Sequence, residues 1–289
     1  MPIDVSAALS AAPTVREAAW TERDVILYHL GLGAGADSLD PAELGWVYEK
    51  NLRVLPTFAM VAGQGVSSGA PSRAGMNLPG IDIDLRKILH GGQSLTEHAP
   101  IPASGTATIS SRVADVWDKG KAAVIVLEQS AGDADGNPLW TTGMQIWARG
   151  EGGFGGEPGP EVTAAMPDRE ADKVLVSTTD PRQALVYRLS GDLNPLHADP
   201  SFAQMAGFDR PILHGLASYG IVCKAVVDGV LDGDPSRIKS FSARFAGSLY
   251  PGETIETAVW REGDTLTLLA TCPERDGQAV LTHATVEVL

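Results

Sequence analysis

The sequence is poor in cysteine and in long apolar runs. Only two of its 289 residues are cysteines, Cys223 and Cys272, and they lie far apart, without the short spacing of a metal site. We therefore expect a reducing compartment and two thiols that serve as small core side chains. No apolar run approaches the roughly 18 residues of a membrane-spanning helix, so no membrane association is expected.

Cationic residues are also scarce. The 22 Lys and Arg face 36 Asp and Glu, which gives a formal net charge of −14. A general nucleic-acid binder needs clustered Lys and Arg for its phosphate contacts, so the composition argues against that class. A phosphorylated small molecule stays open, because it needs only a few local cations.

No export signal is expected in the first residues. The segment MPIDVSAALSAAPTVREAAW has Asp4 where a signal peptide carries Lys or Arg, and it contains no continuous apolar stretch. We therefore predict a cytoplasmic location.

A linker is predicted near the middle of the chain. Glycine and proline dominate residues 150–160, GEGGFGGEPGP, and no apolar period runs through them. A phosphate-binding glycine loop is the alternative, but the Lys-Ser/Thr ending and a following helix are missing. The expected organisation is an N-terminal module over residues 1–149 and a C-terminal module over residues 161–289.

The sequences on the two sides of this linker resemble each other. RVLPTFAMVAG at residues 53–63 is matched by RPILHGLASYG at residues 210–220. Residues 98–128 and 245–270 both run from proline and glycine into an alternating strand, a charged glycine turn and a second apolar strand. This pattern is typical of antiparallel meanders, so we infer a duplicated module.

A long buried helix is predicted in the second module. An apolar stripe of about four turns recurs at spacings of three and four, through Leu216, Tyr219, Cys223, Val226, Val227 and Val230. Gly229 and the DGD that follows Leu231 predict its end. One such helix beside an antiparallel sheet in each module gives an α+β protein.

A second glycine-rich segment, TERDVILYHLGLGAG, contains Gly31, Gly33 and Gly35. A dinucleotide-binding loop would follow a strand, whereas Thr21 and Asp24 predict the start of a helix here. No dinucleotide cofactor is expected.

The segment SGDLNPLHADP carries the candidate chemistry. Gly191 allows a tight backbone path and Pro195 fixes φ, so Asp192, Asn194 and His197 lie on a constrained loop. Taken singly, Asp192 and Asn194 are typical of turn residues, and His197 is typical of a partly buried histidine. Together with the Pro-x-x-His-Gly that follows, they favour a functional site. Directly after the loop, DPSFAQMAG predicts a short helix that begins with Asp and Pro and ends at Gly.

This region resembles the signature of the (R)-specific enoyl-CoA hydratases, the MaoC-like dehydratases, in YRLSGDLNPLH and AGFDRPILHGL. VLPTF, LHGGQ and DKGKAAVIV resemble the first half of two-module members. These members include the hydratase part of peroxisomal multifunctional enzymes and mycobacterial hydroxyacyl-thioester dehydratases. The resemblance covers most of the chain. It implies an α+β double hot-dog fold, in which each module wraps an antiparallel sheet around a long central helix.

The resemblance also implies a reaction, the reversible addition of water to trans-2-enoyl-CoA that gives (3R)-3-hydroxyacyl-CoA in fatty-acid metabolism. This hydro-lyase would use no metal and no separate cofactor, since coenzyme A is part of the substrate, and it would be a homodimer. The first half has Pro56 and Thr57 at the place of His214 and Gly215. It is therefore implied to be non-catalytic and to house the acyl chain.

The implied catalytic residues are Asp192 and His197, with Asn194 beside them and the backbone N–H of Gly215 on the thioester oxygen. A histidine accepts a proton near neutral pH, and an aspartate can hold the same water. A backbone N–H at a helix start stabilises developing negative charge. The implied coenzyme A contacts are His90, Gly91, Lys119, Asp192, Leu193, Asn194, Pro195, Leu196, His197, Gly215 and Phe245. Lys119 also fits a solvated turn lysine.

Four other functions stay open from the residues. Asp192, His197 and His214 could bind a metal in a hydrolase. GVSSG at residues 65–69 formally matches the elbow of a serine hydrolase, with Ser67 as nucleophile. A hot-dog acyl-CoA thioesterase and a non-catalytic acyl-CoA-binding protein complete the set.

Overall fold

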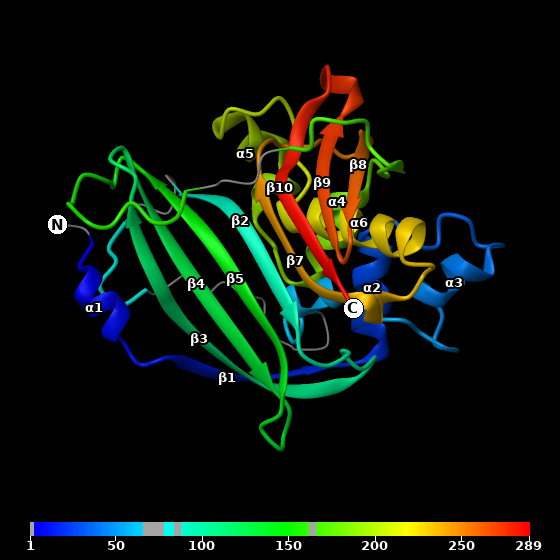
Figure 1. Ribbon diagram of the computed structural model, residues 1–289, viewed down its shortest axis with the longest axis horizontal. Helices are drawn as coiled ribbons and strands as arrows, with labels where there is room; N and C mark the ends of the chain where they lie inside the picture. Colours follow the sequence, from blue (N-terminus) through cyan, green and yellow to red (C-terminus); the bar gives the residue numbers. More distant parts are fainter. Residues whose placement is uncertain (1–2, 66–77, 84–87, 162–165) are drawn as a thin grey trace.

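The computed structural model describes residues 3–65, 78–83, 88–161 and 166–289, and its strands form one ten-stranded antiparallel sheet (Figure 1). The first half of the chain contributes β1 (Thr14–Trp20), β2 (Ile88–Glu97), β3 (Gly105–Asp118), β4 (Ala122–Gly132) and β5 (Pro138–Arg149). The second half contributes β6 (Lys173–Thr178), β7 (Ile238–Phe245), β8 (Thr254–Glu262), β9 (Thr265–Cys272) and β10 (Gln278–Val288).

The strand order shows the duplication directly. From the first edge of the sheet the order is β1-β3-β4-β5-β2, and from the other edge it is β6-β8-β9-β10-β7. The two halves meet where β2 pairs with β7, with Gly92 opposite Arg244 and Thr96 opposite Ser240. Each half therefore repeats one topology, and the join places β2 and β7 at the centre. The exact limits of the two modules stay a prediction.

The predicted long helix is α6 (Gly215–Val230), which packs against β6, β7, β8 and β10. Most of its side chains are buried. Tyr219 fixes its position, because the ring stacks on Phe241 at 4.1 Å and the hydroxyl donates to the Phe241 carbonyl at 2.7 Å. Since β7 carries Phe241, this contact ties α6 to the join between the two halves.

The remaining helices of the described residues are short. They are α1 (Val5–Ser10), α2 (Glu22–Gly31), α3 (Pro41–Val47), α4 (Gln183–Tyr187), α5 (Pro200–Met205) and the 3-10 helices η1 (Pro56–Met60), η4 (Arg188–Ser190), η5 (Pro195–His197), η6 (Pro235–Arg237) and η7 (Pro273–Arg275). The helix start expected at Thr21 is confirmed, because its backbone N–H and hydroxyl both donate to Asp24 at the start of α2.

The prediction of a long helix in the first module is wrong for the described residues. The segment that matches the start of α6 forms η1, followed by a turn. Gly63 has a φ of 71°, and a Cβ there would lie 2.6 Å from the Cβ of Ala18 on β1. Because this left-handed backbone fits tightly against β1, the helical turn cannot continue through it.

The glycines around Gly31 serve packing. A Cβ on Gly31 would lie 2.9 Å from the Cα of Tyr187, so the glycine lets α2 approach α4 closely.

In the glycine-rich linker, two backbone N–H groups are already hydrogen-bonded within the protein. The Asp118 carboxylate accepts the backbone N–H groups of Gly153 and Gly155 at 2.8 and 2.7 Å. These amides are therefore not free for a phosphate.

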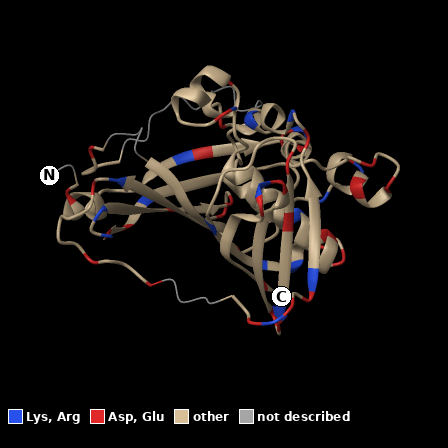
Figure 2. Cartoon of the chain, turned by 90° about the horizontal axis from the view of Figure 1, so that it is seen from above, with Lys and Arg blue, Asp and Glu red and all other residues tan. Residues whose placement is uncertain are grey.

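Charges are dispersed over the fold. Figure 2 shows separate blue and red segments on strands and loops, with no continuous blue face in the described parts of the chain. This distribution agrees with the argument against a general nucleic-acid binder. In the same parts of the chain, none of the helices has the length and apolar character to cross a membrane.

One buried histidine has a structural role and supports a stability prediction. His29 Nδ1 donates to the Trp46 carbonyl at 2.8 Å, and Nε2 accepts the Leu55 N–H at 3.3 Å. Burial lowers the pKa of His29 to about 4, from an ordinary value of 6.5. Below pH 6.5 the unfolded chain takes up a proton that the folded chain refuses. The free energy of unfolding should therefore fall by up to about 1.4 kcal/mol per pH unit between pH 6.5 and 4.

Urea unfolding at several pH values measures this slope. His29→Gln should make the slope shallower by up to the same amount, whatever its effect on absolute stability. His98→Gln is the matched control, because His98 is exposed. Equal slopes in the parent and in His29→Gln would contradict the assignment.

Candidate active site

The loop between α4 and α5 packs closely against the first half of the chain at Gly191. Gly191 separates η4 from the turn that leads into η5, and its φ is 131°. A Cβ at this position would lie 2.7 Å from the Cβ of Gln64 and 2.9 Å from its carbonyl oxygen. Only glycine fits without displacing the first half of the chain.

Asp192 and Asn194 build the turns of this loop. The Asn194 N–H donates to Asp192 Oδ1 at 3.1 Å, and the Leu196 N–H donates to Asn194 Oδ1 at 3.0 Å. These are the local turn bonds that Asp and Asn commonly make. Asp192 is exposed, and Oδ2 has no hydrogen-bond partner within the described residues. One carboxylate oxygen thus holds the turn, and the other stays available to a water molecule or a substrate.

His197 lies buried at the end of η5, 8% exposed. Its Nδ1 donates to the Ile212 carbonyl at 2.8 Å, which leaves Nε2 as the acceptor in the neutral ring. Burial lowers the pKa of His197, while the Ile212 hydrogen bond and the charge of Asp192 act in the opposite direction. The side chain is therefore an oriented neutral base at neutral pH.

His214 lies directly against this base, at the N-cap of α6. The two imidazole rings stack with centroids 3.7 Å apart and planes at 26°. His214 Nε2 donates to the Asp192 carbonyl at 3.1 Å, which ties the loop between α4 and α5 to the start of α6. Burial, and next the neighbouring charge of His197, lower the pKa of His214. A neutral His214 follows, with its Nδ1 buried and unpartnered within the described structure.

These three side chains converge. A carboxylate oxygen of Asp192 and one ring nitrogen each of His197 and His214 lie within 4.8 Å of one another. The structure therefore brings together the two residues that the sequence predicted as a catalytic pair. Their catalytic roles stay a prediction.

The same three residues were candidates for a metal site. A metal ligand presents its nitrogen lone pair in the plane of the imidazole ring. His197 and His214 stack face to face with their ring planes at 26°, whereas two histidines that share a metal usually turn their ring edges toward it. Two of their four ring nitrogens are already donors to backbone carbonyls. The arrangement favours proton transfer over metal binding.

Gly215 begins α6 immediately after His214. A Cβ at Gly215 would lie 3.2 Å from the Phe245 ring, so glycine leaves room between the helix start and β7. The His90 ring meets Phe245 edge-on, with centroids 4.5 Å apart, and His90 Nε2 bonds to Gln93 Oε1 at 3.1 Å. Burial lowers the pKa of His90 to about 4, and Asp192 acts in the opposite direction. His90, Phe245 and Gly215 therefore lie around the loop between α4 and α5.

The other residues predicted to contact coenzyme A lie in the loop between α4 and α5, in β2 and in the turn between β3 and β4. Leu193, Pro195 and Leu196 belong to the loop itself, and Gly91 lies at a β-bulge in β2. Lys119 lies in the turn between β3 and β4, where Nζ donates to the Pro160 carbonyl at 3.4 Å. Binding of coenzyme A by these residues stays a prediction.

Sequence reasoning missed two contributions to this site. It considered His214 as a metal ligand and not as a neutral ring stacked on the base. It did not consider Tyr187, whose ring lies 4.9 Å from His214 and whose buried hydroxyl has no partner within the described residues. Tyr187 opens the YRLSGD stretch of the signature, and that position was the available signal.

Two family models match the chain, one on each side of the linker. The MFE-2 hydratase 2 N-terminal domain matches residues 19–150, and the MaoC like domain matches residues 162–272. The enoyl-CoA hydratase ChsH3 of Mycobacterium tuberculosis is 48% identical over 281 residues, with 97% of each chain covered. The chain belongs to the MaoC-like dehydratase family.

Solved structures agree with this MaoC-like assignment. A MaoC-like dehydratase from Phytophthora capsici superposes with a TM-score of 0.89 at 30% identity, over 99% of this chain and 98% of that chain. A Mycobacterium tuberculosis protein described as a double hotdog fold has a TM-score of 0.56 at 12% identity, over 96% of each chain, and supports the fold alone. The predicted α+β double hot-dog fold is confirmed.

Proposed function

We propose that this protein is an (R)-specific enoyl-CoA hydratase, a hydro-lyase that adds water reversibly to trans-2-enoyl-CoA and gives (3R)-3-hydroxyacyl-CoA. The observation that carries the proposal is the approach of Asp192 to His197, with His197 oriented by the Ile212 carbonyl. Membership in the MaoC-like family and the name of the mycobacterial relative support the reaction class.

The proposed mechanism gives each residue of the site one role in hydration. A water molecule between Asp192 and His197 Nε2 loses a proton to this pair as its oxygen attacks C3 of the enoyl group. The pair returns a proton to C2, so atoms and charge balance. The Gly215 N–H, at the positive end of α6, stabilises the charge that develops on the thioester oxygen. Asn194 orients the water or the neighbouring carboxylate without titrating.

Coenzyme A is expected to lie along His90, Gly91 and Phe245, with Lys119 as a contact for a phosphate. The first half of the chain is expected to house the acyl group. We also expect a homodimer in the cytoplasm and a role in fatty-acid metabolism. The acyl length and the choice between coenzyme A and an acyl carrier protein are open parts of this proposal.

A panel of trans-2-enoyl-CoA esters of increasing chain length tests the reaction. We expect loss of enoyl absorbance and a single (3R)-hydroxy product on a chiral column. A (3S) product would contradict the family assignment of stereochemistry. Release of free thiol in the same assay would identify a thioesterase, and binding without turnover would identify an acyl-CoA-binding protein.

The serine hydrolase alternative has less support. Only Gly65 of the GVSSG match is described, and residues 66–69, including Ser67, lie outside the described parts of the chain. A fluorophosphonate should leave Ser67 unlabelled, and covalent labelling there would favour that class.

A further inference from the structure

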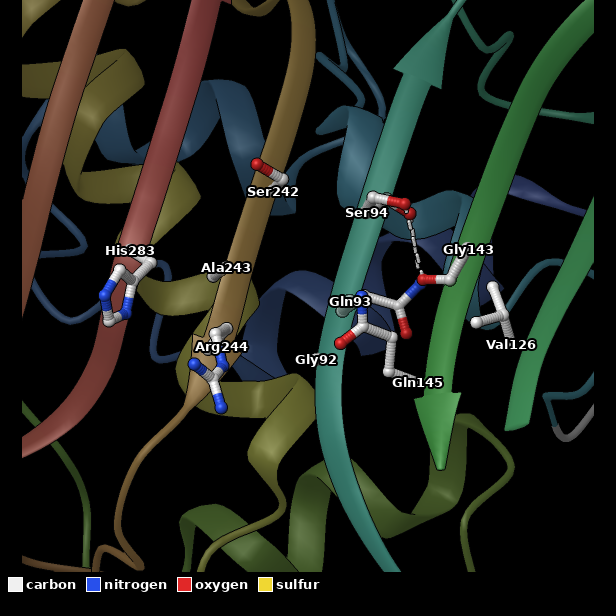
Figure 3. Close-up of a pocket in the computed structure, with 10 residues that line it drawn as sticks. All are labelled: Gly92, Gln93, Ser94, Val126, Gly143, Gln145, Ser242, Ala243, Arg244 and His283. Carbon is white, nitrogen blue, oxygen red and sulfur yellow. Dashed lines mark hydrogen bonds between the residues drawn. The ribbon is translucent and has the colours of Figure 1, made fainter. Parts of the chain in front are cut away.

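A pocket lies at the centre of the sheet, where the two halves of the chain join (Figure 3). Its volume is about 310 Å³. Its walls come from β2, β4, β5, β7 and β10, through Gly92, Gln93, Ser94, Val126, Gly143, Gln145, Ser242, Ala243, Arg244 and His283. Among these residues, Gln93 also contacts the site around Asp192 and His197, through its bond to His90.

The pocket opens on the face of the sheet that points away from α6. Phe245 faces the helix, since its ring is the nearest neighbour of the Gly215 position. Successive side chains of a strand point to opposite faces, so Arg244 points away from α6. Figure 3 shows Arg244 in front of the strands, with the helices behind them. The pocket and the candidate active site therefore lie on opposite faces of the same two strands.

Unpaired polar groups gather in this pocket. The side chains of Arg244, Ser242 and Gln145 have no hydrogen-bond or ion-pair partner among the residues that the structure describes. The Ser94 hydroxyl has one long contact, 3.5 Å, with the Gly143 carbonyl. The Arg244 guanidinium, the Ser242 hydroxyl and the weakly bonded Ser94 hydroxyl can all donate hydrogen bonds to a ligand.

His283 adds a buried polar atom. It has a φ of 47° and lies at an irregularity of β10, between the pairings of Leu281 and Ala284. A non-glycine residue rarely adopts such a φ within a strand. The bulge directs the ring to the pocket, and Nδ1 is buried without a partner in the described structure.

Small residues keep the space open. Gly92 lies opposite Arg244 across β2 and β7, and Ser94 lies opposite Ser242. A Cβ on Gly143 would lie 2.5 Å from the Ser94 hydroxyl oxygen. A Cβ on Gly92 would press against the Gln145 side chain, at 3.2 Å. Larger side chains at these positions would fill the space in front of Arg244.

We propose that this pocket binds a small molecule through a carboxylate or phosphate group. Arg244 supplies a planar fork of N–H groups that matches either oxyanion in a bidentate manner. The hydroxyls of Ser94 and Ser242 and the His283 ring supply further polar contacts. The volume lies at the lower end of the range of small-molecule sites, so the ligand is small. This site is independent of the proposed hydratase reaction.

Calorimetric titration of the full chain with inorganic phosphate and, separately, with citrate tests the proposal. We expect saturable binding of one equivalent of at least one of the two probes. Arg244→Gln should weaken it by about tenfold or more, because hydrogen bonds to charged groups are the stronger ones. Lys239→Gln is the matched control. It removes one positive charge from the same strand, where Lys239 is exposed and lies 3.4 Å from Glu287. Its effect should stay within about twofold.

A competition with coenzyme A separates anion binding in this pocket from anion binding in the substrate site. Saturating coenzyme A should leave the titration unchanged, because the candidate active site lies on the other face. Loss of binding with coenzyme A, together with no effect of Arg244→Gln, would place the anion in the substrate site and overturn the proposal. Absence of binding by both probes would also overturn it.

Thiol labelling of Ser242→Cys tests whether the pocket is accessible. Both native cysteines are buried, so the introduced thiol reports the pocket. We expect labelling that phosphate or citrate slows. An unreactive thiol in a dimer that binds neither probe would show that a second copy covers this face, which contradicts a small-molecule site.

Discussion

Asp192→Asn should lower the kcat for hydration by about two to four orders of magnitude, the range usual for a lost acid–base group. The amide keeps the shape of the carboxylate, and its oxygen can still accept the Asn194 N–H that Asp192 Oδ1 accepts at 3.1 Å. The substitution therefore removes the charge and the proton-accepting oxygen while it preserves the turn. The measurement is the initial rate of enoyl absorbance change at saturating substrate.

Asp199→Asn is the matched control for this variant. Asp199 caps α5 and accepts the N–H groups of Ser201 and Phe202, and asparagine fills the same capping role. We expect its kcat to stay within a fewfold of the parent value. Urea unfolding of both variants verifies that they fold. A folded Asp192→Asn protein with near-parent turnover would exclude Asp192 from the chemistry.

Local signals in the sequence account for much of the fold. The spacing of apolar residues from Leu216 to Val230 predicts α6, because a buried helix needs an apolar surface at that period. Asp199 and Pro200 predict the start of α5, since capping depends on residues within one turn. These features are decided by neighbours in the chain, so a single sequence contains the information.

Features decided by distant residues were not accessible. Within the described residues, the first module has η1 and no long helix because Gly63 fits against Ala18 on β1, a contact between separate elements. The join between β2 and β7 depends on the folding of both halves. The pocket around Arg244 exists only after this join, and no local pattern marks it.

The candidate site shows the same division. The motif predicts that Asp192, Asn194 and His197 share a loop, and their turn bonds are local. The ring stack of His197 on His214 and the bond from His214 to the Asp192 carbonyl depend on how α6 meets the loop. The two interpretations of Asp192, as a turn residue and as a catalytic residue, are therefore compatible. Its Oδ1 holds the turn, and its other oxygen stays available for the proposed chemistry.

His197→Gln should lower kcat by about two to four orders of magnitude as well. Glutamine offers no proton-accepting nitrogen, so the base is lost. His197→Asn is the companion variant, because its amide nitrogen can take the place of Nδ1 and donate to the Ile212 carbonyl, 2.8 Å from Nδ1 in the parent. If His197 acts as a base, both variants lose turnover. If His197 only anchors the loop, His197→Asn should keep most of it.

The pH profile gives an independent readout of the same residue. Burial lowers the pKa of His197 below its ordinary value of 6.5, so the ring is neutral at pH 7 and becomes protonated only at lower pH. Parent activity should therefore hold from pH 8 to 6.5 and then fall as the ring takes up a proton. The residual activity of His197→Gln should lack the part of this acid limb that His197 causes. The same acid limb in the parent and in the variant would assign the titration to another group and remove His197 as the base.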